Sequence, residues 1–291
     1  MDLLRAELNR LRYRRRFLWG LLAVLLVSLA APMLWMDAAR PLSQAELAEG
    51  QAAFDSIPGG ECPECSVADY LRSPWPFSVV VESGILPFVV MIALMTLGIT
   101  VLYVGSDFRS GAVATQLTFT PRRTALVLTR SAVSGLLGGS VMAIATVVST
   151  VVSAIWFIAL NGYQAFDATP VLLGLVLAAL FYGLVLGALG GLLTVLAGGA
   201  SVAATLLLGV FVVDVLTLSL SVEATLPGWV YHLLPTQQAY ALLHGSAESY
   251  NIAGEMFLTI GRVEAVVYHL LVVLLVAAVT LPLFERRDIK N

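Results

Sequence analysis

The chain has 291 residues, of which 59% are hydrophobic and 12% are charged, and its formal net charge is −3. Soluble domains carry about 25% charged residues, so this composition excludes an ordinary globular protein and favours a polytopic membrane protein. The single lysine, Lys290, follows no glycine-rich loop, which excludes a phosphate-binding loop of the GxxxxGK[ST] kind in this chain.

The first 16 residues are rich in arginine and have a helical pattern. Leu4, Leu8 and Leu11 fall on one face of that helix, and arginines fall on the opposite face. This periodicity predicts an amphipathic helix on the inner membrane surface, and a solvated basic tail is the alternative. The apolar run 17–36 predicts the first span. A cleaved signal peptide is the alternative there, but the run is longer than the usual signal core.

The segment 37–84 carries eight acids and two arginines, so we expect an outer loop. It contains Cys62 and Cys65, the two cysteines of the chain. Two thiols exclude a four-cysteine zinc site within one chain. On the outer face they favour a local disulfide, and two idle thiols are the alternative.

A second span is expected at 85–104, and the short polar segment 105–125 follows it. Ser106 or Asp107 can cap a helix, and Gly111 lets the chain turn. Ala112–Leu117 then predicts a short helix that stops at Pro121. The segment is basic, with Arg109, Arg122 and Arg123. Two hypotheses remain open on composition: a lever that docks a cytosolic partner, and an ordinary connector made basic by the orientation rule.

Four further apolar runs predict spans at 126–160, 171–197, 200–221 and 263–284. Glycines near residue 198 predict a tight turn between the fourth and fifth spans. The segment 222–262 is rich in Pro, Trp and Tyr and predicts outer helices that dip partway into the membrane, with Thr236 capping a short helix that ends near Gly245. The tail 285–291 is basic. Arginine placement alternates as six spans require and puts both termini in the cytoplasm of a cell whose plasma membrane holds the chain.

The predicted fold is therefore an all-α polytopic membrane protein, organised as one transmembrane domain. It has six transmembrane helices, an N-terminal interfacial helix, and partly re-entrant outer helices between spans five and six.

Charged and small residues inside the spans are candidate functional positions. Asp214 lies midway along span five and must be paired, protonated or turned to the bundle interior, either as a substrate or cation contact or as a buried link between helices. His269 and Glu264 predict a pair near the outer end of span six, and Arg130 is expected to extend to the inner surface. Small-xxx-small spacing in span four indicates internal packing or a dimer face; its members are Gly183, Gly187, Gly190 and Gly191.

The loop after the second span resembles that of ABC-2 type transporter permeases. The residues that carry the resemblance are Asp107, Phe108, Arg109, Gly111, Leu117, Pro121, Arg122 and Arg123, with Arg130 opening the next span. Leu234-Pro235 before a short helix, and the ending that starts at Phe284, are also similar to that family.

This resemblance implies a coupling helix at 105–125 that contacts cytosolic ABC ATPase subunits, which would hold ATP and Mg while this chain binds no cofactor. It also implies a second copy of the chain or a related permease. The expected function is the membrane subunit of an ATP-driven exporter of a lipophilic drug, peptide or lipid-like substrate. No enzymatic activity and no nucleic-acid partner are expected.

Two other functions remain open. An ion-coupled secondary transporter would need broken helices with ion ligands near the midplane, and Asp214 is the one clear intramembrane carboxylate. A non-transporting membrane anchor or regulatory subunit is the third possibility. An intramembrane serine hydrolase is disfavoured because the chain has no Gly-x-Ser-x-Gly sequence.

Overall fold

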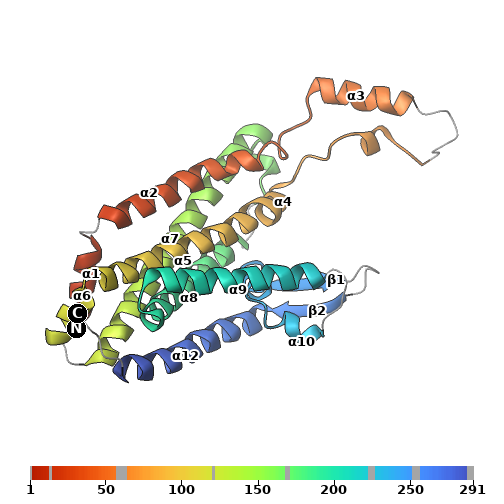
Figure 1. Ribbon diagram of the computed structural model, residues 1–291. Coiled ribbons are helices and arrows are strands. Elements are labelled where there is room, and N and C mark those ends of the chain that lie inside the picture. Colours follow the sequence, from red (N-terminus) through yellow and green to blue (C-terminus); the bar gives the residue numbers. More distant parts are fainter. Residues whose placement is uncertain are drawn as a thin grey trace.

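The computed structural model describes residues 2–12, 15–56, 64–119, 122–167, 171–221, 227–250 and 256–286. It is an elongated helical bundle with an arm at one end (Figure 1). The elements are α1 (Asp2–Arg12), α2 (Arg15–Ala30), η1 (Ala31–Leu34), α3 (Gln44–Asp55), η2 (Val67–Tyr70), α4 (Phe77–Val80), η3 (Val81–Ile85), α5 (Leu86–Arg109), α6 (Ala112–Phe119), α7 (Arg123–Asn161), η4 (Tyr163–Ala165), α8 (Val171–Ala197), α9 (Ala200–Ser221), α10 (Gly228–Tyr231), α11 (Pro235–His244), β1 (Ser246–Tyr250), β2 (Met256–Gly261) and α12 (Arg262–Arg286).

Among the described residues, five helices are long and apolar enough to cross a membrane. They are Phe77–Arg109, Arg123–Asn161, Leu172–Ala197, Ala200–Thr217 and Arg262–Arg286. The run expected as the first span forms α2 and a 3₁₀ turn, and its apolar part, Leu18–Leu34, is shorter than these five. The architecture is consistent with a helical polytopic membrane protein, and the sixth crossing stays a prediction.

The helix expected at 85–104 is longer at both ends. It begins at Phe77, passes through the π-helical turn η3, and continues to Arg109. Gly84 in this turn lies against the ring of Trp35, which a Cβ would overlap. The Trp35 Nε1–H donates to Ser153 Oγ of α7 at 3.2 Å. A single π turn inside a long helix is a common local adjustment, and here it brings a backbone without a side chain to the indole.

The centre of the bundle is the contact between α7 and α8. Glycines on one helix meet backbone on the other: a Cβ at Gly138 would overlap the carbonyl oxygen of Gly183, and one at Gly187 would overlap that of Ser134. Gly190 faces Thr100 of α5 instead. The small-residue spacing of span four therefore serves packing within the chain, and this close approach is what small residues permit between membrane helices.

We expect Gly187→Val to lower the free energy of unfolding by about 1–3 kcal/mol or more, because the new side chain must push α7 and α8 apart. The matched control is Gly209→Val, also in mid-helix, where nothing lies within 4 Å of a built Cβ. Denaturant titration of both variants in the same micelle measures the difference. An equal loss in the two would contradict this packing role.

The segment between α9 and α12 differs from the sequence-based expectation. It contains the short helices α10 and α11, followed by an antiparallel hairpin of β1 and β2 in which Ala247 pairs with Ile260. Leu258 and Ile260 are buried and Thr259 between them is exposed, which is the alternation of a strand. α11 ends before Gly245, which has φ 115°. Its N-cap is Leu234, so the expectation that Thr236 caps it is wrong.

The arm carries α3 and lies at the opposite end of the bundle from α1 and α6 (Figure 1). Its base is closed by Glu46, which accepts from the Arg40 guanidinium at 2.8 and 2.9 Å and from Arg72 at 3.3 Å. Arg72 also donates to the carbonyl oxygens of Ala38 and Arg40. Ser43 and Glu46 form a capping box at the start of α3. One carboxylate thus joins both chain segments of the arm.

The Arg40 guanidinium, with Ser43, lowers the pKa of Glu46 to about 2. Because the folded pKa lies below the unfolded one, the stabilisation is complete above about pH 4.5 and is lost as the pH falls towards 2. Carboxyl ¹³C NMR of the micelle-bound protein should show Glu46 ionised throughout pH 6 to 3. In Arg40→Gln the midpoint should rise, because the largest cause of the shift is removed while Ser43 and Arg72 remain. The same titration in both proteins would contradict the assigned cause.

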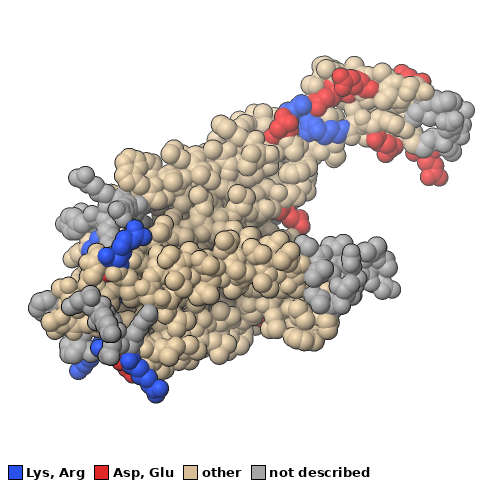
Figure 2. Space-filling model, in the orientation of Figure 1, with Lys and Arg blue, Asp and Glu red and all other residues tan. Residues whose placement is uncertain are grey.

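The two ends of the bundle differ in charge. α1, α6 and the C-terminal end of α12 lie at one end, which we call the basal end, and α3 and the hairpin lie at the other, the distal end (Figure 1). In Figure 2 arginine side chains gather at the basal end, and most visible acids cover the arm. Long apolar helices therefore separate two polar ends of different composition.

Candidate coupling site at the basal end

Four helices meet around a group of buried charged side chains at the basal end. We call this group the basal charge cluster; its members are Glu7, Arg10, Asp107 and Arg130, with Tyr103 and Gln116 beside them. The carboxylate of Asp107 is the centre, because Arg10 of α1 donates to both its oxygens at 3.0 and 2.8 Å. Arg130 of α7 lies 3.2 Å from the same carboxylate.

Glu7 of α1 forms the second half of the basal charge cluster. Its carboxylate accepts from the Tyr103 hydroxyl at 3.4 Å and from the Gln116 amide at 3.2 Å, and it lies 3.7 Å from Arg130 Nε. Arg130 also donates to the Gln116 side-chain carbonyl. Gln116 belongs to α6, so this short helix is joined by side-chain contacts to α1 and α7.

The charged side chains of the basal charge cluster are buried, so the loss of any one of them should destabilise the fold. The side chains of Glu7, Asp107 and Arg130 are each 2% exposed, and that of Arg10 is 25% exposed. Among the described side chains, two acids face two arginines, so the described members of the cluster carry no net charge. Removing one member of a buried ion pair leaves an uncompensated charge, which costs far more than the intact pair contributes. The expectation that Arg130 extends to the surface is wrong, since acids on α1 and α5 hold it inside.

The sequence-predicted coupling residues fall into a buried and an exposed group. Asp107 is buried, so any part it has in coupling acts through its partners, which include Arg10 and Arg130. Phe108 and Leu117 are half-buried and pack on the core. Arg109, the last residue of α5, and Arg122, the N-cap of α7, are exposed and flank α6 in the sequence.

The remaining predicted residues concern turns and the end of α6. Gly111 has φ 69°, the left-handed region that suits glycine, and turns the chain between α5 and α6. Arg123 donates to the carbonyl oxygen of Glu285 at 3.1 Å, which joins the start of α7 to the end of α12. Pro121 lies outside the described residues.

The short helix α6 has two different faces. Val113, Gln116 and Leu117 are buried or half-buried, at the i, i+3, i+4 spacing of one helix face. Thr115 and Thr118 are exposed on the other side. The exposed side of α6 is therefore small and polar, its other side is held by contacts with α1 and α7, and an exposed arginine precedes and follows the helix in the sequence.

Sequence reasoning missed Glu7, Arg10, Tyr103 and Gln116. The available signal was the i, i+3 pair of Glu7 and Arg10, which places an acid in the middle of an arginine-rich helix, next to its leucine face. An acid beside the leucine face indicates that this part of the helix packs against a basic partner in the protein and does not lie only on the membrane surface. The identity of that partner depends on contacts between residues 97 positions apart, such as Arg10 and Asp107.

Asp214 of α9 lies outside the basal charge cluster and contacts the first turn of α11. It is 3% exposed and accepts a hydrogen bond from the Thr236 backbone N–H of α11 at 3.2 Å. That N–H is in the first turn of α11, where backbone donors have no partner inside the helix. The contact fits a buried link between α9 and α11, and a substrate contact stays a prediction.

Glu264 and His269 do not pair with each other. Glu264 contacts His232 Nδ1 at 2.6 Å, whereas His269 Nδ1 lies 2.7 Å from the Ala265 carbonyl oxygen. The ring of His269 packs between those of Tyr182 and Tyr268. The predicted pair is therefore wrong, because His269 lies on the inward face of α12 and Glu264 on the outward face.

Cys65 is disulfide-bonded. The other cysteine of the chain, Cys62, lies outside the described residues. The described residues contain no group of three or more His, Cys, Asp or Glu side chains that could hold a metal ion.

Comparison of the chain with protein-family models, with curated proteins and with solved structures found no significant match. The resemblance to ABC-2 permeases therefore rests on the sequence alone: the residues of the loop, Leu234-Pro235 and the ending from Phe284.

Proposed function

We propose that this chain is the membrane-spanning permease subunit of an ATP-driven transporter of the ABC-2 type. A separate cytosolic ABC ATPase docks on α6 and hydrolyses ATP with Mg, and two copies of the chain, or this chain and a related permease, form the pathway. The basal end then faces the cytoplasm, and transport runs outward for a lipophilic drug, peptide or lipid-like substrate.

The observation that supports the proposal most is the attachment of α6. A connector between two spans needs only to close a turn. Here Gln116 contacts Glu7 and Arg130, and the Asp107 carboxylate just before α6 contacts Arg10 and Arg130. A push on the exposed face of α6 is thus passed to α1, α5 and α7 together, since their charges are held in one buried cluster.

In this proposal the chain transmits movement, and ATP, which binds to the partner, supplies the difference in free energy between the two conformations of the transporter. A ligand shifts a conformational equilibrium only if it binds the two states with different affinity. Closure of the ATPases around ATP would move α6, and the long helix α7 would carry that movement across the membrane. The close glycine contacts make α7 and α8 move as one unit, because neither can slide without overlapping backbone.

Copurification tests the proposal. The tagged chain is expressed with the ATPase encoded beside it and extracted in a mild detergent. An ABC ATPase should copurify in a ratio near one to one, and its nucleotide hydrolysis should depend on the presence of this chain. If no nucleotide-binding protein accompanies the folded chain, the proposal loses its support, and the anchor or ion-coupled alternatives take its place.

A further inference from the structure

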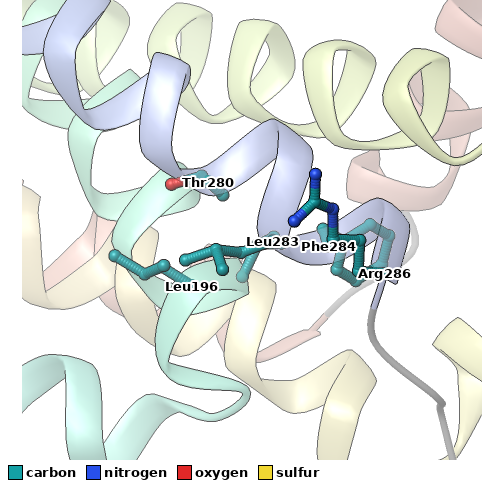
Figure 3. A pocket seen from close by; sticks show the side chains of 6 residues that line it. Leu196, Thr280, Leu283, Phe284 and Arg286 are labelled. Atoms are coloured by element: carbon teal, nitrogen blue, oxygen red, sulfur yellow. The ribbon is translucent and has the colours of Figure 1, made fainter.

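A pocket of about 370 Å³ opens between the C-terminal ends of α8 and α12 at the basal end (Figure 3). Its lining side chains are Val195, Leu196, Thr280, Leu283, Phe284 and Arg286. The volume falls within the range of about 300–1,000 Å³ that is usual for small-molecule sites. The pocket shares no residue with the basal charge cluster, so the coupling contacts do not explain it.

The described lining residues combine an apolar wall with one cation, Arg286. Leu196, Leu283 and Phe284 form the wall, and the guanidinium of Arg286 lies at the end of α12 (Figure 3). Glu285, the neighbouring acid, is not among the lining residues. This pattern fits an amphiphile that has an anionic group near Arg286 and an apolar part beside the leucines and the phenylalanine.

Thr280 adds a polar group deeper in the pocket. It is 0% exposed, and its hydroxyl has no hydrogen-bond partner within the described part of the chain. Threonines in membrane helices can bond to their own backbone, as Thr194 does to the Gly190 carbonyl oxygen at 2.6 Å. Thr280 does not, so an oxygen from a ligand would satisfy a buried donor that the protein leaves unpaired.

We propose that this pocket binds one anionic phospholipid of the leaflet at the basal end. The phosphate lies at Arg286, and an ester carbonyl oxygen accepts from Thr280 after the threonine side chain rotates towards the pocket, because its hydroxyl is fully buried in this structure. These residues are six positions apart, about 9 Å along the helix, a spacing suited to a phosphate and a glycerol ester. The acyl chain continues along α12, where Leu274 and Leu275 are exposed. The proposal does not depend on the transport function.

Native mass spectrometry of the purified protein tests it, with palmitoyl-oleoyl phosphatidylglycerol and phosphatidylcholine as probes. One phosphatidylglycerol should bind at least about tenfold more tightly than phosphatidylcholine, because the lipids share their chains and differ in charge. Arg286→Gln should remove this preference. Thr280→Val should weaken both lipids several-fold, and Leu196→Trp should fill the pocket and abolish tight binding.

The controls separate the pocket from general attraction. Arg109→Gln removes another exposed arginine from the same end, and Leu275→Trp enlarges a side chain on the lipid-facing surface; both should bind as the wild type does. Glycerol 3-phosphate, a head group without chains, should not compete. Equal binding of the two lipids, an unchanged preference in Arg286→Gln, or full competition by glycerol 3-phosphate would each overturn the proposal. Arg286 is exposed, so its variant tests the site even if the Leu196 variant fails to fold.

Discussion

Replacing Arg130 by methionine should lower the free energy of unfolding by about 3–5 kcal/mol. The side chain is 2% exposed, and its loss removes one of the two arginines that face Glu7 and Asp107 among the described side chains. Methionine has a similar length, so the lost volume is small and the uncompensated carboxylate dominates the effect. Denaturant titration in a fixed micelle, followed by tryptophan fluorescence, measures the change.

A double variant separates charge from packing. Asp107→Asn combined with Arg130→Met restores a neutral cluster of Glu7 and Arg10, so it should lose less stability than the two single changes added together. Arg109→Met, at an exposed position of the same end, should stay within about 0.5 kcal/mol of the wild type. Additive losses, or a loss in Arg130→Met no larger than in Arg109→Met, would show that the buried charges are not coupled.

Reversing the charge of both Arg109 and Arg122 to glutamate should weaken association with the partner ATPase at least about tenfold, since like charges placed across an interface are strongly unfavourable. Both side chains are exposed, one before α6 and one after it in the sequence, so the fold and its unfolding midpoint should remain unchanged. Copurification at graded salt concentrations measures the association.

The matched control keeps the charge. Arg109→Lys with Arg122→Lys should retain most of the ATPase, because the positive charges stay while the planar geometry of arginine is lost. Undiminished association of the glutamate variant would mean that the partner does not use the exposed side of α6. An equal loss in the lysine variant would point to arginine geometry as the main contribution instead of charge.

The long apolar helices were predictable from the sequence, and their exceptions have identifiable causes. α8 and α9 follow long apolar runs in which Asp214 is the one charged residue, and the glycines between them form a turn in which Gly198 has φ 73°. The start of the long helix Phe77–Arg109 was not predictable, because Glu82 and Gly84 interrupt its hydrophobic pattern. The π turn there depends on Trp35, which is distant in the sequence.

The site was predictable only in its local parts. The short helix, the glycine turn and the exposed arginines follow from residue types within 15 positions. The basal charge cluster joins residues about 100 positions apart, and one sequence contains no sign of which acid meets which arginine. The rule that a lone arginine near a span end extends to the surface failed for Arg130, because its acid partners come from other helices. The hairpin was not predicted, because the aromatic and proline residues that precede it are typical of interfacial helices.

Site-specific photocrosslinking from α6 tests the central claim most directly. A benzophenone amino acid at Thr118, exposed on that helix, is compared with one at Gln51, exposed on α3 of the arm. In intact cells the Thr118 probe should form an adduct with a protein that binds ATP and carries an ABC ATPase sequence, and the Gln51 probe should not. Absence of that adduct at normal expression, or its formation from Gln51 instead, would contradict the assignment of α6 as the contact with a separate motor.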